Sequence, residues 1–486
     1  MSFRFLYLFL FLAVGSKASP CFELNNQVIQ AYQQLNRLDF VAFDSIVVQL
    51  QTNQPLNRFG DYLESLRTEI ILLIDENPIH YRQALSHREQ LIQKIENTPE
   101  NSPYKYWALA DIHMYWALIR AKYNDELHAA LDLRQAIKYG SLCKSRYPWF
   151  LPVLKTNAIC LGMATAVPDK YSWLAQLAGI KGNKSESIQT LEDFLNHPLI
   201  NSSFAYLIPE AACFYIAMKF NIYGEFENQV PAIETNSSEL LQFAFIWLHS
   251  KTKKPEELIK KVNVLEPKIR GVDFCYLKYL KAEAKLNLLI DPQADFLGFL
   301  LCTKGHSFKR SAFRKLAWNQ LIQGNEKGYR EWMKVIQLSP TSTNDEDIQA
   351  GLESQRSIIP PRELIQSRLL FDGGNFQKSL DYVQTCSPAN LDQVLEKDYR
   401  IARCLENLNQ RGSAVTYYKK VIKAGSSSVE YFAASSALQL ALYYQNQNKT
   451  DSVNYFCSLV ETLPNLAYKK SLSMKARALK KNSIKR

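Results

Sequence analysis

Residues 402–421 read ARCLENLNQRGSAVTYYKKV, and this stretch decides the fold of the chain. In its second half a small residue, Ala414, is followed four positions on by Tyr418 and three positions later by Val421. Residues three and four apart lie on one face of a helix, so the small residue lets a neighbouring helix approach and the tyrosine fills the groove beside it. Together with Ala402 and Leu405 before it, the pattern predicts an antiparallel helical hairpin.

The same pattern occurs four times between residues 312 and 464. Its predicted packing positions are Gly328 and Trp332, then Ser379, then Ala414 and Tyr418, and finally Ser452 and Phe456. The small residues are separated by 51, 35 and 38 residues, so the first interval carries an insertion. One hairpin cannot bury its own apolar face, whereas stacked neighbours can. We therefore expect an all-α chain that forms an α-α superhelix, a solenoid of antiparallel helix hairpins.

These units resemble tetratricopeptide repeats, whose period is about 34 residues. The resemblance covers residues 311–466, and no unit carries the full family pattern, because Ala402 and Leu440 stand where the family has a first-helix glycine. It implies a non-enzymatic scaffold that binds a protein or peptide. The hypothesis places the binding surface on the inner side of the solenoid, built from the first helices of successive repeats.

Residues 19–310 keep helical apolar patterns without clean repeats, and we interpret them as a divergent helical-repeat region. Strand signals are nearly absent. Within residues 161–194, Pro168 begins a short helix, Gly179 and Gly182 form its exit turn, and an amphipathic helix follows with Ile188 and Phe194 on its apolar face. This passage resembles the inclusion-body clearance family of tetratricopeptide-repeat proteins, and the resemblance implies action through protein contacts. We expect an exported bacterial relative.

Residues 1–18 match an export signal. Arg4 gives a positive start, residues 6–14 form an uninterrupted apolar run, and Ala18 ends a small-residue cleavage site, so the mature chain is expected to begin at Ser19. Lipid attachment at Cys21 is an alternative, which Pro20 directly before it disfavours. The expected location is the periplasm or the cell envelope.

The net charge of +11 is concentrated at the end of the chain, because residues 467–486 hold eight basic residues and no acid. The other 466 residues carry only +3 together, so the sequence does not support nucleic-acid binding, which would require a basic stripe along the repeats. Apolar residues recur at helical spacing within this tail. It is predicted to be a basic amphipathic helix that caps the last repeat, with peripheral membrane contact through Lys469 to Arg486 as the alternative.

The sequence offers no catalytic set, no metal-ligand spacing among its seven histidines and no nucleotide loop, so we expect no enzyme activity, no cofactor and no metal site. The nine cysteines are widely spaced without a Cys-x-x-Cys, which favours buried thiols with at most one or two disulfides. A rival hypothesis keeps the scaffold but assigns it to a nutrient- or glycan-binding protein beside an outer-membrane transporter. That rival predicts surface clusters of Tyr and Trp and lipidation of Cys21.

Overall fold

A computed structural model describes residues 21–99, 101–166, 182–223, 233, 238–340 and 344–484. Within these ranges the regular structure is helical, apart from one isolated bridge between Asp39 and Arg270. The expected export signal, Pro168 and Gly179 lie outside the described residues. The chain is therefore all-α over the part that the structure describes, as the sequence predicted.

The chain forms two compact units. The first comprises Met1–Leu35, Val41–Glu69 and Ala84–Leu207, and the second comprises Asn36–Phe40, Ile70–Gln83 and Ile208–Arg486. The expected boundary at residue 310 falls inside the second unit. The helices up to the start of the second unit's main segment are α1 (Asn26–Asn36), α2 (Phe40–Asn53), α3 (Phe59–Asp75), α4 (Pro78–Glu96), α5 (Pro103–Lys122), α6 (Glu126–Arg146), α7 (Val153–Met163), η1 (Ala164–Ala166), α9 (Lys184–Asn196), α10 (Pro198–Ser203), η3 (Ala205–Leu207) and α11 (Ile208–Tyr223).

The first unit contains a long hairpin of α5 and α6. The hydroxyl of Ser102 accepts a hydrogen bond from the Tyr104 amide, and Pro103 occupies the first turn of α5, where its missing N–H costs nothing. The side chains of Trp107 and Trp116 from α5 are almost fully buried. This hairpin fixes the position of the loop that follows α6.

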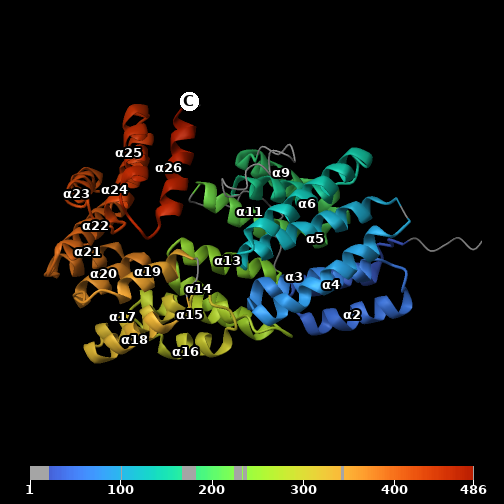
Figure 1. The fold of residues 1–486 in the computed structure, drawn as a ribbon, viewed down its shortest axis with the longest axis horizontal. Coiled ribbons are helices and arrows are strands. Elements are labelled where there is room, and N and C mark those ends of the chain that lie inside the picture. The colour runs from blue at the N-terminus through green and yellow to red at the C-terminus, as the bar shows by residue number, and fades with distance from the viewer. Residues whose placement is uncertain are drawn as a thin grey trace, which may run out of the picture. The chain divides into compact units, whose positions relative to one another are not determined.

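The second unit contains successive helix hairpins, which can be followed in Figure 1 from α13 in green to α26 in red. Within each hairpin the two helices pack against each other. Their bounds are α13 (Glu239–Lys251), α14 (Pro255–Leu265), η4 (Glu266–Lys268), α15 (Cys275–Asn287), α16 (Gln293–Cys302), α17 (Lys309–Ile322), α18 (Glu326–Leu338), α19 (Asp345–Ser354), α20 (Arg362–Asp372), α21 (Phe376–Thr385), α22 (Leu391–Asn407), α23 (Arg411–Ala424), α24 (Phe432–Gln445), α25 (Thr450–Thr462) and α26 (Lys469–Ile484).

Every hairpin turn from α13/α14 to α24/α25 has the same backbone geometry. A residue with positive φ follows the first helix, and the next amide bonds to the carbonyl five residues back, as in a Schellman motif. The left-handed residues are Lys253, Leu289, Gly324, Gly374, Asn409 and Asn448. The corresponding bonds run from Lys254 to His249, Ile290 to Lys285, Asn325 to Gln320, Asn375 to Leu370, Gln410 to Leu405 and Lys449 to Tyr444, at 2.8–3.2 Å.

These turns define six hairpins, and the repeat begins before residue 311. The left-handed residues are separated by 36, 35, 50, 35 and 39 residues. The interval of 50 contains α19, an extra helix that packs on α17 and α18. First helices of neighbouring hairpins also contact each other, in the order α13, α15, α17, α20, α22 and α24. Contact both within and between hairpins is the packing of a solenoid.

The seven predicted packing residues all lie on second helices. Ser379, Ala414, Gly328 and Tyr418 are buried. The side chain of Trp332 is half-buried and stacks on Phe313, with ring centroids 5.7 Å apart. In α25 the half-buried residues are Ser452 and Phe456, and the neighbouring stripe of Val453, Cys457 and Val460 is the buried one.

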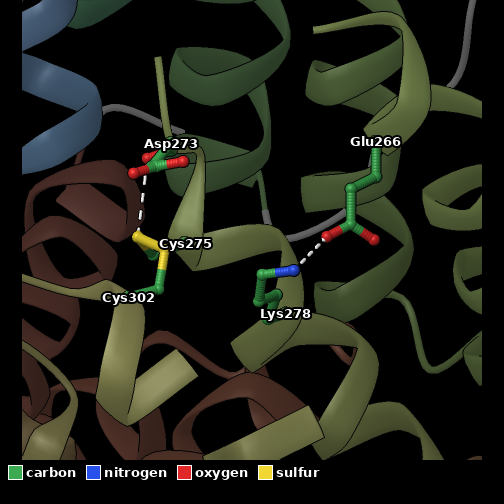
Figure 2. Close-up of a disulfide and its surroundings, with 5 residues drawn as sticks. All are labelled: Glu266, Asp273, Cys275, Lys278 and Cys302. Atoms are coloured by element: carbon green, nitrogen blue, oxygen red, sulfur yellow. Dashed lines mark hydrogen bonds and ion pairs between the residues drawn. A yellow bond between two sulfur atoms is a disulfide. The ribbon is translucent and has the colours of Figure 1, made fainter. Parts of the chain in front are cut away.

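One disulfide joins Cys275 at the start of α15 to Cys302 at the end of α16. Figure 2 shows it beside an ion pair in which Lys278 Nζ lies 2.6 Å from Glu266 Oε1. Cys275 Sγ lies 3.5 Å from the Asp273 carbonyl oxygen. The remaining seven cysteines are free, and five of them are buried.

Candidate functional site

The first helices of the second unit carry a network of buried ion pairs. The Arg314 guanidinium donates to Glu346 Oε2 at 2.5 Å and to Glu353 Oε1 at 3.3 Å. Arg368 donates to the same Glu353 oxygen at 3.0 Å. Both guanidinium groups lie over the ring of Trp318, 4.7 and 4.5 Å from its centroid. The network thus ties α17 and α20 to the inserted helix α19.

The inserted segment also caps the amino terminus of α17. Both oxygens of the buried Asp347 carboxylate accept backbone hydrogen bonds, from Ser311 at 2.7 Å and from Phe308 at 2.8 Å. A carboxylate at a helix N-terminus satisfies otherwise unpaired amides and interacts favourably with the helix dipole. Helix α17 therefore takes its cap from another part of the chain.

A second cluster continues the network along α22 and α24. Arg400 pairs with Glu396 at 3.2 Å, and the Tyr399 and Ser435 hydroxyls lie 2.8 Å apart. The ring of Tyr431 packs against Tyr468, with centroids 4.9 Å apart. The Tyr468 hydroxyl in turn donates to Glu346 Oε1 at 3.4 Å. The segment before α26 therefore reaches back to α19.

The electrostatics of this network keep its carboxylates ionised. Burial alone would raise the pKa of Glu353, but the nearby Arg314 and Arg368 lower it to about 2. Burial would also raise the pKa of Glu346, but the positive charges of Lys315 and Arg314 hold that pKa well below the usual range. Both carboxylates are paired with cations from α17 or α20, so the pairs tie these helices to α19. This arrangement fits a structural role.

The first helices are accordingly buried by their own neighbours. In α17 and α20 the charged residues Arg314, Lys315 and Arg368 are less than a tenth exposed, and in α22 the same is true of Arg400 and Glu396. The hypothesis placed partner binding on this inner face. These side chains are covered and paired within the chain, so they are not available to a partner.

Exposed apolar side chains gather where second helices end and first helices begin, along what we call the N-edge of the solenoid. Antiparallel hairpins place these helix ends together on one edge. The side chains are 44–88 % exposed, and we call this set the N-edge stripe: Leu338, Ile358, Leu391, Val429 and Leu466. Val264 and Leu301 hold the equivalent places at the ends of α14 and α16 and are also exposed.

Hydrogen bonds join the consecutive helix ends and loops that carry the stripe, so its members follow one another along the edge. An ion pair from Arg356 to Glu430 adds a tie between the loops before α20 and α24. The hydrogen bonds run from Gln337 Nε2 to the Ser354 carbonyl, from Gln393 Nε2 to the Ile359 carbonyl (3.4 Å), from Ser428 Oγ to Asp392 Oδ1 (3.4 Å) and from the Leu466 amide to the Val429 carbonyl (3.0 Å).

A row of exposed apolar side chains along one edge is a candidate interaction surface. Single exposed leucines are common and carry little information, whereas a contiguous apolar patch rimmed by polar groups marks a binding site. The stripe residues also recur with the repeat: Ile358, Leu391, Val429 and Leu466 are separated by 33, 38 and 37 residues. The sequence reasoning missed them because it searched for residues that pack helices together. Their period was the available signal.

The basic tail packs as a cap. Leu472 and Ala476 of α26 are buried against the last hairpin, and Lys469 Nζ donates to the carbonyls of Glu461 and Leu463 at the end of α25. A cation at a helix C-terminus complements the helix dipole. The apolar face of α26 is thus already used within the chain. Lys470 and Lys475 are exposed, and Arg477 donates to Glu461 Oε1 at 2.7 Å.

The described residues were also considered for a membrane-spanning helix and for a metal site. No helix there is long and apolar enough to cross a membrane. Nor do the described residues contain a group of three or more His, Cys, Asp or Glu side chains that could hold a metal ion.

Comparison with known proteins gives little to set beside this geometry. No protein-family model matches the chain, and no curated protein matches it. Among solved structures, the chain is similar to one described as "Crystal structure of APC/C hetero-tetramer Cut9-Hcn1", at 10 % identity over 93 % of this chain and 96 % of that chain, with a TM-score of 0.24. A score this low carries no argument, so the fold rests on the hairpins and turns described above.

Proposed function

We propose that this chain is a non-enzymatic α-solenoid scaffold that binds a protein or peptide partner through the N-edge stripe. The row of exposed apolar residues, which recur at the repeat spacing along one edge, is the observation that carries the proposal. Folding does not require large apolar residues at these loop positions, because the side chains are exposed and contribute little to the core. Their burial by a partner would recover that free energy on binding.

We further propose that the protein acts in the cell envelope after export. The pattern of residues 1–18 supports this, and so does the disulfide between Cys275 and Cys302, because disulfides persist in oxidising compartments and are rare in the cytosol. Kinship with the inclusion-body clearance family is likewise a proposal, and it is supported by the residues of 161–194 alone.

Site-specific photo-crosslinking in the native host tests the binding surface. A photoreactive phenylalanine is placed at Leu391 or Val429, and the matched control places it at Ile290, which is 50 % exposed on the opposite edge of the solenoid. We expect one envelope protein to crosslink from the two stripe positions and not from the control. Equal crosslinking from Ile290 would count against the stripe.

A binding measurement with the captured partner then completes the test. The double variant Leu391→Glu/Val429→Glu should weaken affinity about tenfold or more, because charges replace apolar contacts, while Ile290→Glu should leave it unchanged. Reproducible turnover of a small molecule by the pure protein would contradict the non-enzymatic assignment. For export, the mass of the chain from the host should show Ser19 as its first residue, and an intact residue 1–18 segment would contradict it.

A further inference from the structure

The loop between α6 and α7 in the first unit holds a tryptophan out in solvent. Trp149 is 68 % exposed, yet its backbone is fixed: the Phe150 amide bonds to the Tyr147 carbonyl at 2.9 Å, closing a turn. Pro148 occupies the second position of this turn, where its restricted φ is favourable. Phe150 is buried and anchors the turn in the core. The exposure of Trp149 is thus a property of a rigid loop.

Two tyrosines extend this tryptophan into a row of aromatic rings. The centroid of Tyr147 lies 6.1 Å from that of Trp149 and 6.2 Å from that of Tyr106 on α5. Arg146 lies over the Tyr106 ring, 5.3 Å from its centroid. We call this set, Tyr106, Arg146, Tyr147 and Trp149, the aromatic platform. Trp, Tyr and Arg are the residues that dominate binding energy at protein interfaces.

The polar atoms of the platform are largely satisfied among themselves around Asn101. The Tyr106 hydroxyl donates to Asn101 Oδ1 at 2.7 Å and accepts from Arg146 Nη1 at 2.6 Å. Arg146 Nη1 also donates to Asn101 Oδ1 at 3.2 Å, and the Tyr147 hydroxyl donates to the Asn101 carbonyl at 2.6 Å. These bonds hold the rings in place and commit both tyrosine hydroxyls.

Two parts of the platform remain open to a ligand: the exposed ring of Trp149 with its indole N–H, and the Nη2 and Nε donors of Arg146, which no hydrogen bond to a described residue uses. A polyproline II segment complements this set, because its proline rings pack on aromatic faces and its unpaired carbonyls accept from an indole N–H. The ring row spans up to about 12 Å, the length of about four polyproline II residues at about 3.1 Å each.

We propose that the aromatic platform is a docking site for a proline-rich segment of a partner protein, with an acidic residue that pairs with Arg146. The Arg146 guanidinium over the Tyr106 ring makes the charge beside the rings positive. A saccharide would need several directed polar groups for its hydroxyls, and here the tyrosine hydroxyls are already engaged. This site lies in the first unit and stands independently of the N-edge stripe.

Fluorescence anisotropy with the full mature chain tests the proposal. Three labelled peptides of equal length are compared: octaproline with two flanking aspartates, octaproline with two flanking lysines, and a glycine–serine peptide with the aspartates. We expect saturable binding of the acidic octaproline, weaker binding of the basic one, and none of the glycine–serine peptide.

Variants on the platform then locate the binding. Trp149→Ala should lower the affinity about tenfold or more, and Arg146→Gln should remove the preference for the acidic peptide. The matched control is Leu199→Ala, which changes another exposed apolar residue of the first unit and should have no effect. Because Trp149 is exposed, its variant should keep the circular dichroism spectrum of the parent.

Three results would overturn the proposal. They are the absence of saturable binding to either octaproline, equal binding of the glycine–serine peptide, and binding that survives Trp149→Ala. Trp149-dependent binding of oligosaccharides without peptide binding would overturn it too, in favour of a sugar site.

Discussion

Removing the disulfide between Cys275 and Cys302 should destabilise the second unit by an amount that the loop length sets. The two cysteines are 27 residues apart. In the chain-entropy description, crosslinking a loop of this size removes about 12 cal/mol/K of entropy from the unfolded chain, or about 3.6 kcal/mol at 25 °C. We therefore expect Cys275→Ala/Cys302→Ala to lower the free energy of unfolding by about 3.6 kcal/mol, plus a small packing loss at the buried Cys275.

Urea unfolding measures this change. With an m-value near 3 kcal/mol/M, the midpoint should fall by about 1 M. Wild-type protein in reductant should behave like the double variant, and the variant itself should not respond to reductant. Cys21→Ala is the control, because Cys21 is a free, half-buried cysteine, and its midpoint should stay near that of the parent.

Thiol counting tests whether the disulfide between Cys275 and Cys302 is present. The chain has nine cysteines, of which seven are free. Denatured protein should therefore show seven reactive thiols before reduction and nine after it. Nine thiols without reductant, or an unchanged urea midpoint after reduction, would refute the argument.

Gly324 takes a positive φ with open space around its α-carbon, so Gly324→Ala should lower the free energy of unfolding by about 1 kcal/mol from backbone strain alone. Gly412→Ala within α23 should instead raise it by about 0.5 kcal/mol. Urea unfolding measures both changes. The depressed pKa of Glu353 means that its stabilisation is complete above about pH 5 and is lost toward pH 2. Glu353→Gln should remove up to about 3 kcal/mol of that pH dependence, and an unchanged acid limb would contradict the pairing. Burial lowers the pKa of Lys253 to about 7, although the nearby rings of Phe371 and Phe376 favour its charged form. The unfolded chain then binds more protons between pH 7 and 10.5, so stability should rise with pH there, and Lys253→Met should raise stability at pH 7 and flatten the rise.

The sequence predicted the all-α solenoid because the small-residue pattern reflects how second helices pack. Ala414, Tyr418 and Val421 are buried in α23, where the spacing of three and four placed them. The hairpin turns also carried a sequence signal, since Gly324, Gly374, Asn409 and Asn448 are residue types that tolerate a left-handed backbone. Lys253 and Leu289 do not belong to those types, which hid the two earliest hairpins.

The period of the exposed residues was a sequence signal for the N-edge stripe, whereas the covering of the first helices depends on contacts between segments far apart in the sequence and could not be predicted. Glu346 is seen as part of a charge run in the sequence, and the structure pairs it with Arg314 and places Tyr468 beside it. This pairing fills the inner face. No local sequence pattern predicts that Glu346 in the insertion pairs with Arg314, 32 residues before it.

The buried network and the exposed stripe are physically connected. Ion pairs such as Arg356 with Glu430 fix the loops on the N-edge, so Leu391 and Val429 are held in place before any partner arrives. A pre-organised surface loses less conformational entropy on binding than a mobile one. Burying charges costs free energy that a plain apolar core would avoid, and fixing a set of loops in one arrangement is what such pairs can contribute in return. Under the proposed function, ion pairs such as Arg356 with Glu430 would serve binding indirectly, by holding the loops of the N-edge in one arrangement.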